Sequence, residues 1–216
     1  MKALRILILS AALCTLFILP RAASASGFEG KVKYMMTVDG GDSTTMVYQF
    51  KDGKTRIDVL TSTVGASMLF EKGSTKYVVL LDKQKLFMEH DMAGKELGGD
   101  TANIKVENTG KTETLLGHVC QIWTATSGDG TVAMMWIAPD IDAYFQLGRT
   151  AMSKTTDAGF KMLAKRGMFP LRMVRMKDGK EVSRTDAISI EPQSLDKTLF
   201  SIPEDFHGMG SHDYSR

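Results

Sequence analysis

Two residues that could do chemistry lie close together in one short stretch, His118 and Cys120. In an extended strand, residues i and i+2 point to the same face, so these two side chains would be neighbours. Imidazole and thiolate bind metals, and an imidazole beside a thiol can lower the thiol pKa. A metal site needs a third or fourth ligand, and a nucleophile needs a base and an oxyanion site. The sequence nearby offers neither, so we interpret Cys120 as a small buried apolar side chain and Gly117 as the turn before its strand.

Sulfur and imidazole are also mixed in the segment Met88-Glu-His-Asp-Met92. Thioether and imidazole are soft ligands that suit copper. One hypothesis is therefore a copper- or metal-binding envelope protein. Its ligands would come from Met88, His90, Met92, His118 and Cys120.

The acidic residues favour no catalytic role. Asp140 and Asp142 follow Pro139 at the point where we predict a strand to end and a helix to begin, and a helix N-cap accounts for either of them. The sequence has no paired acids beside a base, no Gly-rich phosphate loop and no Gly-x-Ser-x-Gly elbow. We therefore expect no enzymatic activity and no cofactor.

The N-terminus resembles a secretory signal peptide. Lys2 and Arg5 precede an apolar run of about 14 residues, shorter than the roughly 20 that a membrane-spanning helix needs. The small residues 23–25 then offer a cleavage site. We predict a signal peptide over residues 1–25 cleaved after Ala25, a periplasmic protein, and no stable membrane insertion after cleavage.

The mature chain is close to neutral. Loss of Lys2, Arg5 and Arg21 leaves 24 basic against 25 acidic side chains. No Lys/Arg cluster remains to suggest nucleic acid as a partner. Cys120 is then the only cysteine, so packing rather than an intramolecular disulfide must hold the fold.

Short β-rich segments separated by turn residues run through most of the chain, a pattern typical of an antiparallel meander. Asp52-Gly53 and Asp178-Gly179 are hairpin turn pairs, because glycine accepts the positive φ that tight turns need. Sheets of about ten or eleven strands tend to curl and can enclose an apolar cleft. The predicted strands are residues 28–38, 45–51, 54–60, 66–71, 76–81, 85–90, 104–114, 118–126, 131–138, 170–177 and 181–191.

The pattern changes to helical spacing after Pro139. Residues 141–152 and 157–166 place apolar side chains three or four positions apart, which predicts two short helices. The predicted fold is mainly β with a small α insertion: one curled antiparallel sheet, a half-open barrel covered by two or three short helices. We place a single domain at residues 26–206 and a disordered polar tail at residues 207–216.

Four segments in order carry a resemblance to a known family: residues 28–32, 114–123, 135–140 and 199–206. Together they resemble the exported bacterial domain of unknown function 4412. That family looks similar to the LolA/LolB-like periplasmic lipoprotein carriers, which implies a half-open β-barrel closed by helices. In the carriers, the apolar concave face holds acyl chains. The resemblance brings no catalytic residues, and we find no basic loop suited to lipoprotein transfer.

The leading hypothesis is a non-enzymatic periplasmic protein that binds a lipid or another apolar ligand on the concave face of the sheet, with the two helices as a lid. Methionine is adaptable and suits such a surface. An interaction module with a filled core and no small ligand is a further alternative. The predicted cleft-lining residues are Met46, Met68, Met134, Tyr144, Phe145, Met152, Phe160 and Met162.

Overall fold

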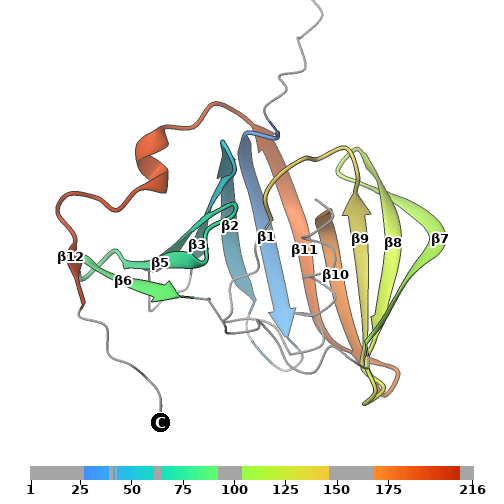
Figure 1. Cartoon of the computed structure of the whole chain (residues 1–216). Coiled ribbons are helices and arrows are strands. Elements are labelled where there is room, and N and C mark those ends of the chain that lie inside the picture. Colours follow the sequence, from blue (N-terminus) through green and yellow to red (C-terminus); the bar gives the residue numbers. More distant parts are fainter. Residues whose placement is uncertain are drawn as a thin grey trace, which may run out of the picture.

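Twelve strands form one sheet in this computed structural model, which describes residues 27–38, 41, 43–60, 65–91, 104–145 and 168–209 (Figure 1). Eleven of the strands correspond to those predicted, with ends that differ by at most two residues. The strands are β1 (Gly30–Val38), β2 (Thr44–Lys51), β3 (Lys54–Leu60), β4 (Gly65–Glu71), β5 (Lys76–Leu81), β6 (Leu86–Asp91), β7 (Lys105–Leu115), β8 (His118–Thr126), β9 (Val132–Ala138), β10 (Phe169–Lys177), β11 (Lys180–Pro192) and β12 (His207–Gly208).

The tight turns follow from residue types that tolerate positive φ. Asp52 and Gly53 have φ of 49° and 74°, so the turn between β2 and β3 has the hairpin geometry that Asp-Gly favours. The turn between β7 and β8 has the same geometry, with φ of 50° at Leu116 and 86° at Gly117. Gly117 therefore makes the turn predicted for it.

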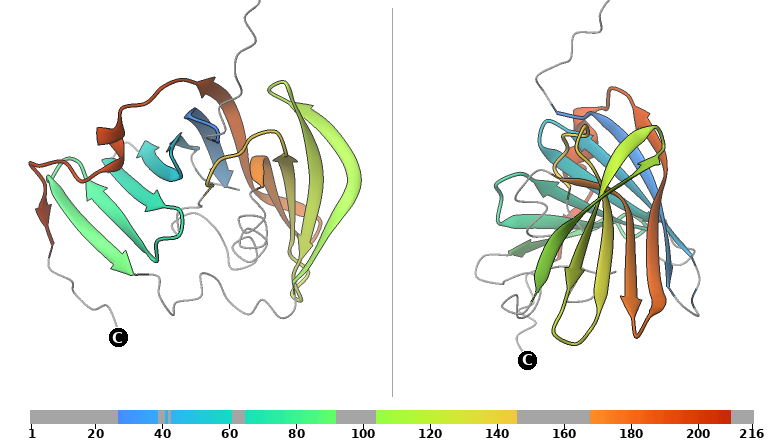
Figure 2. Two further views of the ribbon diagram at one scale, coloured as in Figure 1. Left: turned by 45° about the horizontal axis from the view of Figure 1, so that its top comes forward. Right: turned by 90° about the vertical axis from the view of Figure 1, so that its right-hand side faces the viewer.

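The strand order is β12-β6-β5-β4-β3-β2-β1-β11-β10-β9-β8-β7. All neighbours are antiparallel except β12, which runs parallel to β6. β1 pairs with β11, with Val32 opposite Ile190, and so joins the two halves of the chain. The sheet bends into a deep arch (Figure 2), as open sheets of this size tend to do. The predicted curled, mainly antiparallel sheet is confirmed.

The C-terminal segment crosses the convex face of β3 to β6. After β11, a 3₁₀ turn (Lys197–Phe200) is capped by the Asp196 side chain. Phe206 then packs with Leu69 and Leu80, and the chain adds β12 beside β6. We predicted a disordered tail from residue 207, but its first residues are ordered. The main-chain NH groups of His207 and Met209 donate to the carbonyls of Lys85 and Phe87.

A polar cluster on the same convex face holds this segment. Arg56 donates to Asp58 (2.7 Å), to Ser67 (2.8 Å) and to the carbonyl of Leu199 (3.2 Å). Gln49, which is also buried, donates to the other oxygen of Asp58 at 2.7 Å. Each polar group therefore has a partner, which burial requires.

The predicted helices are not seen. Residues 141–145, the first five of the twelve residues in the helix predicted over 141–152, have no helical structure. The rest of that helix and the helix predicted over 157–166 lie outside the described residues. Within the residues that the structure describes, the 3₁₀ turn is the single helical element. No helix in this described part is long and apolar enough to span a membrane.

Candidate functional site

The concave face of β1 to β6 carries a continuous apolar row. Side chains directly opposite one another in paired strands share a face, so the ladder registers define the row. Its four members on β1 to β4 are buried, whereas the two on β5 and β6 are half-buried. The row consists of Val32, Tyr48, Ile57, Met68, Val79 and Met88.

Two of the predicted cleft residues belong to this face. Met68 is a member of the row, and Met46 lies beside it, opposite Tyr34. Met46 and Met68 keep only 6% and 7% of their surface exposed. They therefore pack in the core beneath the concave surface.

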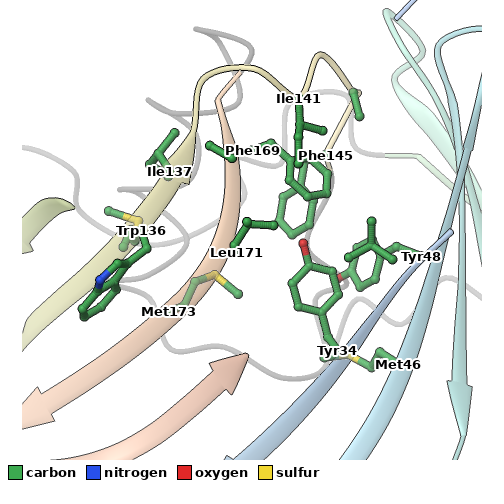
Figure 3. Packing of buried hydrophobic residues seen from close by; sticks show 14 of the residues in the cluster. Tyr34, Met46, Tyr48, Trp136, Ile137, Ile141, Phe145, Phe169, Leu171 and Met173 are labelled. Atoms are coloured by element: carbon green, nitrogen blue, oxygen red, sulfur yellow. The ribbon is translucent and has the colours of Figure 1, made fainter. Parts of the chain in front are cut away.

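An aromatic cluster fills the middle of the arch. The ring of Phe145 stacks on Tyr48 at 5.1 Å between centroids and meets the edge of Phe169 at 5.1 Å. Figure 3 shows Phe145 between the strand that carries Phe169 and the strand that carries Tyr48. Phe145 thus joins β10 to β2 across the concave side, and its position is that of a core residue rather than of a helical lid.

The segment that carries Phe145 is extended across the concave face. Its alternate residues Ile141, Ala143 and Phe145 are buried, a period of two that explains why no helix forms there. Phe28 donates its main-chain NH to the Asp142 carbonyl at 2.5 Å. The hydroxyl of Thr55, which is fully buried, donates to the carbonyl of Tyr144. Asp142 therefore caps no helix, and Tyr144 is half-buried beside the core.

The concave face continues over the other half of the sheet. Met173 on β10 lies opposite Met135 on β9, and Met135 lies opposite Trp123 on β8. Met134 lies on the opposite face, between Val174 and Thr124 in the ladders, so Met135 takes the concave position on this strand. Met152, Phe160 and Met162 lie outside the described residues.

His118 and Cys120 share one face of β8, but their surroundings favour packing over chemistry. Cys120 is fully buried, and burial raises the pKa of its thiol, assisted by the negative charges of Asp140 and Glu113. Its Sγ lies 3.6 Å from the His118 carbonyl. The His118 ring pairs with Asp140 at 2.7 Å. A reactive thiolate requires a lowered pKa and exposure, and Cys120 has neither.

The residues of the metal hypothesis are divided between distant strands. Met88 and His90 lie on β6, where His90 stacks on Tyr77 at 4.9 Å. His118 and Cys120 lie on β8, and eight strands separate β6 from β8 in the sheet order. Met92 lies outside the described residues. Within the part that the structure describes, no three His, Cys, Asp or Glu side chains are grouped to hold a metal ion.

One charged residue of the concave side escaped the sequence analysis. Arg175 lies on the same face of β10 as Met173, which precedes it by two residues. The apolar-polar alternation of residues 169–177 is weak, because buried residues occur on both faces of β10. Only the ladder register therefore shows which way Arg175 points.

Comparison with solved structures finds similar folds at low identity. An uncharacterised conserved protein from Thermus thermophilus superposes with a TM-score of 0.51 and 11% identity, over 84% of this chain and 90% of that one. MucB in the MucA/MucB complex of Pseudomonas aeruginosa gives 0.49 and 12%, over 84% and 57%. A LolA superfamily protein, NE2245 from Nitrosomonas europaea, gives 0.32 and 12%, over 81% and 90%. At these identities the likeness to the Thermus protein concerns the fold alone, and the lower TM-scores add nothing to it.

The sequence comparison is more specific. No curated protein is significantly similar to the chain. Residues 28–206 match the family described as "Domain of unknown function (DUF4412)", which covers most of the chain. The protein therefore belongs to the DUF4412 family, as its sequence motifs predicted.

Proposed function

We propose that this protein is a non-enzymatic binding protein of the periplasm that takes an apolar or amphipathic ligand, such as a lipid or acyl chain, against the concave face of its sheet. The observation that carries the proposal is the unbroken apolar row from Val32 to Met88. The exposed fraction of the side chains rises along this row, from 0% at Val32 to half-buried side chains at Val79 and Met88. The concave face thus offers apolar contact to a ligand at β5 and β6.

The curled sheet with its apolar concave face agrees with this role, and the signal-peptide pattern supports the location. Ligand sites are mostly apolar concave surfaces with a few polar groups, which is the composition found here. The location is tested by cell fractionation with N-terminal sequencing. We expect a periplasmic protein that begins at Ser26. A cytoplasmic protein that keeps residues 1–25 would contradict the proposal.

Ligand binding is tested with the fluorescent apolar probe N-phenyl-1-naphthylamine and a matched pair of variants. Val78 and Val79 are neighbours on β5 and both are half-buried, but alternation puts Val79 on the concave face and Val78 on the convex face. We expect Val79→Asp to weaken probe binding about tenfold or more, because a bound probe would exclude water from the new carboxylate. Val78→Asp should leave probe binding within about twofold, because its carboxylate lies on the face away from the probe. Urea denaturation of both variants checks that each is folded.

Native mass spectrometry of protein purified from the periplasm provides an independent readout, because a bound lipid adds its mass to the chain. A wild-type protein that carries no lipid and takes up no probe would refute the proposed function. Equal loss of binding in both variants would place the ligand elsewhere than the concave face.

A further inference from the structure

Arg175 is a charged residue among small and mostly apolar side chains on the concave face. On β9 and β8 its row continues with Ala133 and Ala125, which are 2% and 0% exposed. On the other side it lies opposite Ser183 of β11. Arg175 itself is half-buried, and its Nε is shielded from solvent. A permanent positive charge therefore lies among small and apolar neighbours.

The other arginines in the described part of the chain all have carboxylate partners. Arg56 pairs with Asp58 at 2.7 Å, Arg172 with Asp186 at 2.5 Å, and Arg184 with Glu181 at 2.6 Å. Arg175 forms no ion pair within the described residues, and its buried Nε has no hydrogen-bond partner. Native proteins rarely leave a buried donor unsatisfied, so this donor needs an explanation.

Arg172 and Arg175 lie on the same strand but on opposite faces of it, and only Arg172 has carboxylate partners among the described residues. Arg172 lies three residues earlier on β10, points to the convex face, and is held by Asp186 and by Glu113 at 3.0 Å. The positions that flank Arg175 in the ladders carry Ser183 and Ala133 instead of acids.

We propose that Arg175 binds the anionic head of an amphipathic ligand, a carboxylate or phosphate, whose apolar chain lies along the concave face. This inference rests on the proposed function, and it narrows the ligand from apolar molecules in general to those with an oxyanion at one end. The guanidinium presents donors in a planar fork that matches carboxylate and phosphate oxygens. A ligand oxygen would satisfy this donor, which has no partner among the residues that the structure describes.

The test compares two ligands with the same chain, laurate and 1-dodecanol, as competitors of N-phenyl-1-naphthylamine at pH 8, where laurate is ionised. We expect Arg175→Gln to weaken competition by laurate about 10- to 100-fold, the range of a charge-assisted hydrogen bond, and to leave dodecanol within about twofold. Arg175→Lys keeps the charge and should retain part of the laurate affinity. Arg184→Gln removes the same charge from the convex face and should change neither ligand.

The outcomes separate the two proposals. If neither laurate nor dodecanol displaces the probe from the wild-type protein, both the proposed function and this inference fail. If both ligands compete but Arg175→Gln affects them equally or not at all, the inference alone is overturned. Inorganic phosphate should not compete at millimolar concentration, and strong competition by it would show a site for free oxyanions instead. The urea midpoints of the variants establish that each is folded.

Discussion

Replacement of Phe145 by alanine tests whether the segment 141–145 packs across the concave face. Phe145 is 4% exposed, stacks on Tyr48 with an interplanar angle of 9°, and meets Phe169 edge-on. Loss of a buried phenylalanine side chain costs about 3–5 kcal/mol, because the removed contacts and the cavity left behind both contribute. Aromatic pairing adds about 0.5–1.5 kcal/mol per pair beyond burial. We therefore expect Phe145→Ala to lower the free energy of unfolding by about 4 kcal/mol.

Urea denaturation followed by tryptophan fluorescence measures this change. With a slope of about 2–3 kcal/mol per molar urea, the midpoint should fall by about 1.3–2 M. Val119 is 58% exposed on β8, so Val119→Ala is a surface control that should change stability by less than about 0.5 kcal/mol. A loss below about 1 kcal/mol for Phe145→Ala would mean that the segment does not pack across the concave face in solution, and the description of the aromatic cluster would be wrong.

Three further predictions concern local features. Cys120 is buried, and burial raises the pKa of its thiol, so the folded protein should resist Ellman's reagent at pH 8 and react fully in urea. Rapid reaction of the folded protein would contradict the buried position of Cys120. Hydrogen bonds from Ser127 and Thr131 lower the pKa of Asp129 from 3.8 to about 2. The Asp129 carboxylate therefore stabilises the fold above pH 3.8, the pKa of the unfolded state, and this stabilisation is lost as the pH falls towards 2. The urea midpoints of wild type and Asp129→Asn should therefore differ at pH 6 and converge near pH 2, and a constant difference would rule out this titration. Leu116 has φ of 50° in a turn that favours asparagine before glycine. Leu116→Asn should therefore raise the free energy of unfolding, measured by urea denaturation, by about 0.5–1 kcal/mol. A decrease would show that the exposed Leu116 side chain makes stabilising contacts.

The strands were predictable because their signals are local. The Asp-Gly pairs at residues 52–53 and 178–179 mark hairpin turns wherever they occur between β-rich segments, and the structure forms a turn at each. The burial of Cys120 likewise followed from its place in a strand without nearby partners. The segment 141–145 was predicted wrongly, because apolar residues at helical spacing there also fit the alternate burial of an extended chain.

The candidate site depended on information that no short segment holds. Met134 and Met135 are adjacent methionines, and nothing in the local sequence shows which of them faces inward. Only the pairing of β9 with β8 and β10 places Met135 on the concave face. Arg175 is one of several arginines in the sequence. Its lack of a carboxylate partner within the described residues is a property of the strands on either side of it. The pairing of β1 with β11 likewise brings together residues that are far apart in the chain.

The sequence by itself therefore determined the strands, their turns and the family, since each rests on residue types within a few positions of one another. The tertiary structure alone decided which side chains share the concave face, how Phe145 crosses it, and that the buried Nε of Arg175 has no hydrogen-bond partner within the described residues. The physical reason is that a strand alternates its two faces with a period of two, so a change of one residue in register exchanges every inward side chain for an outward one. Register in this sheet is set by pairing between strands, and pairing is a property of the whole fold.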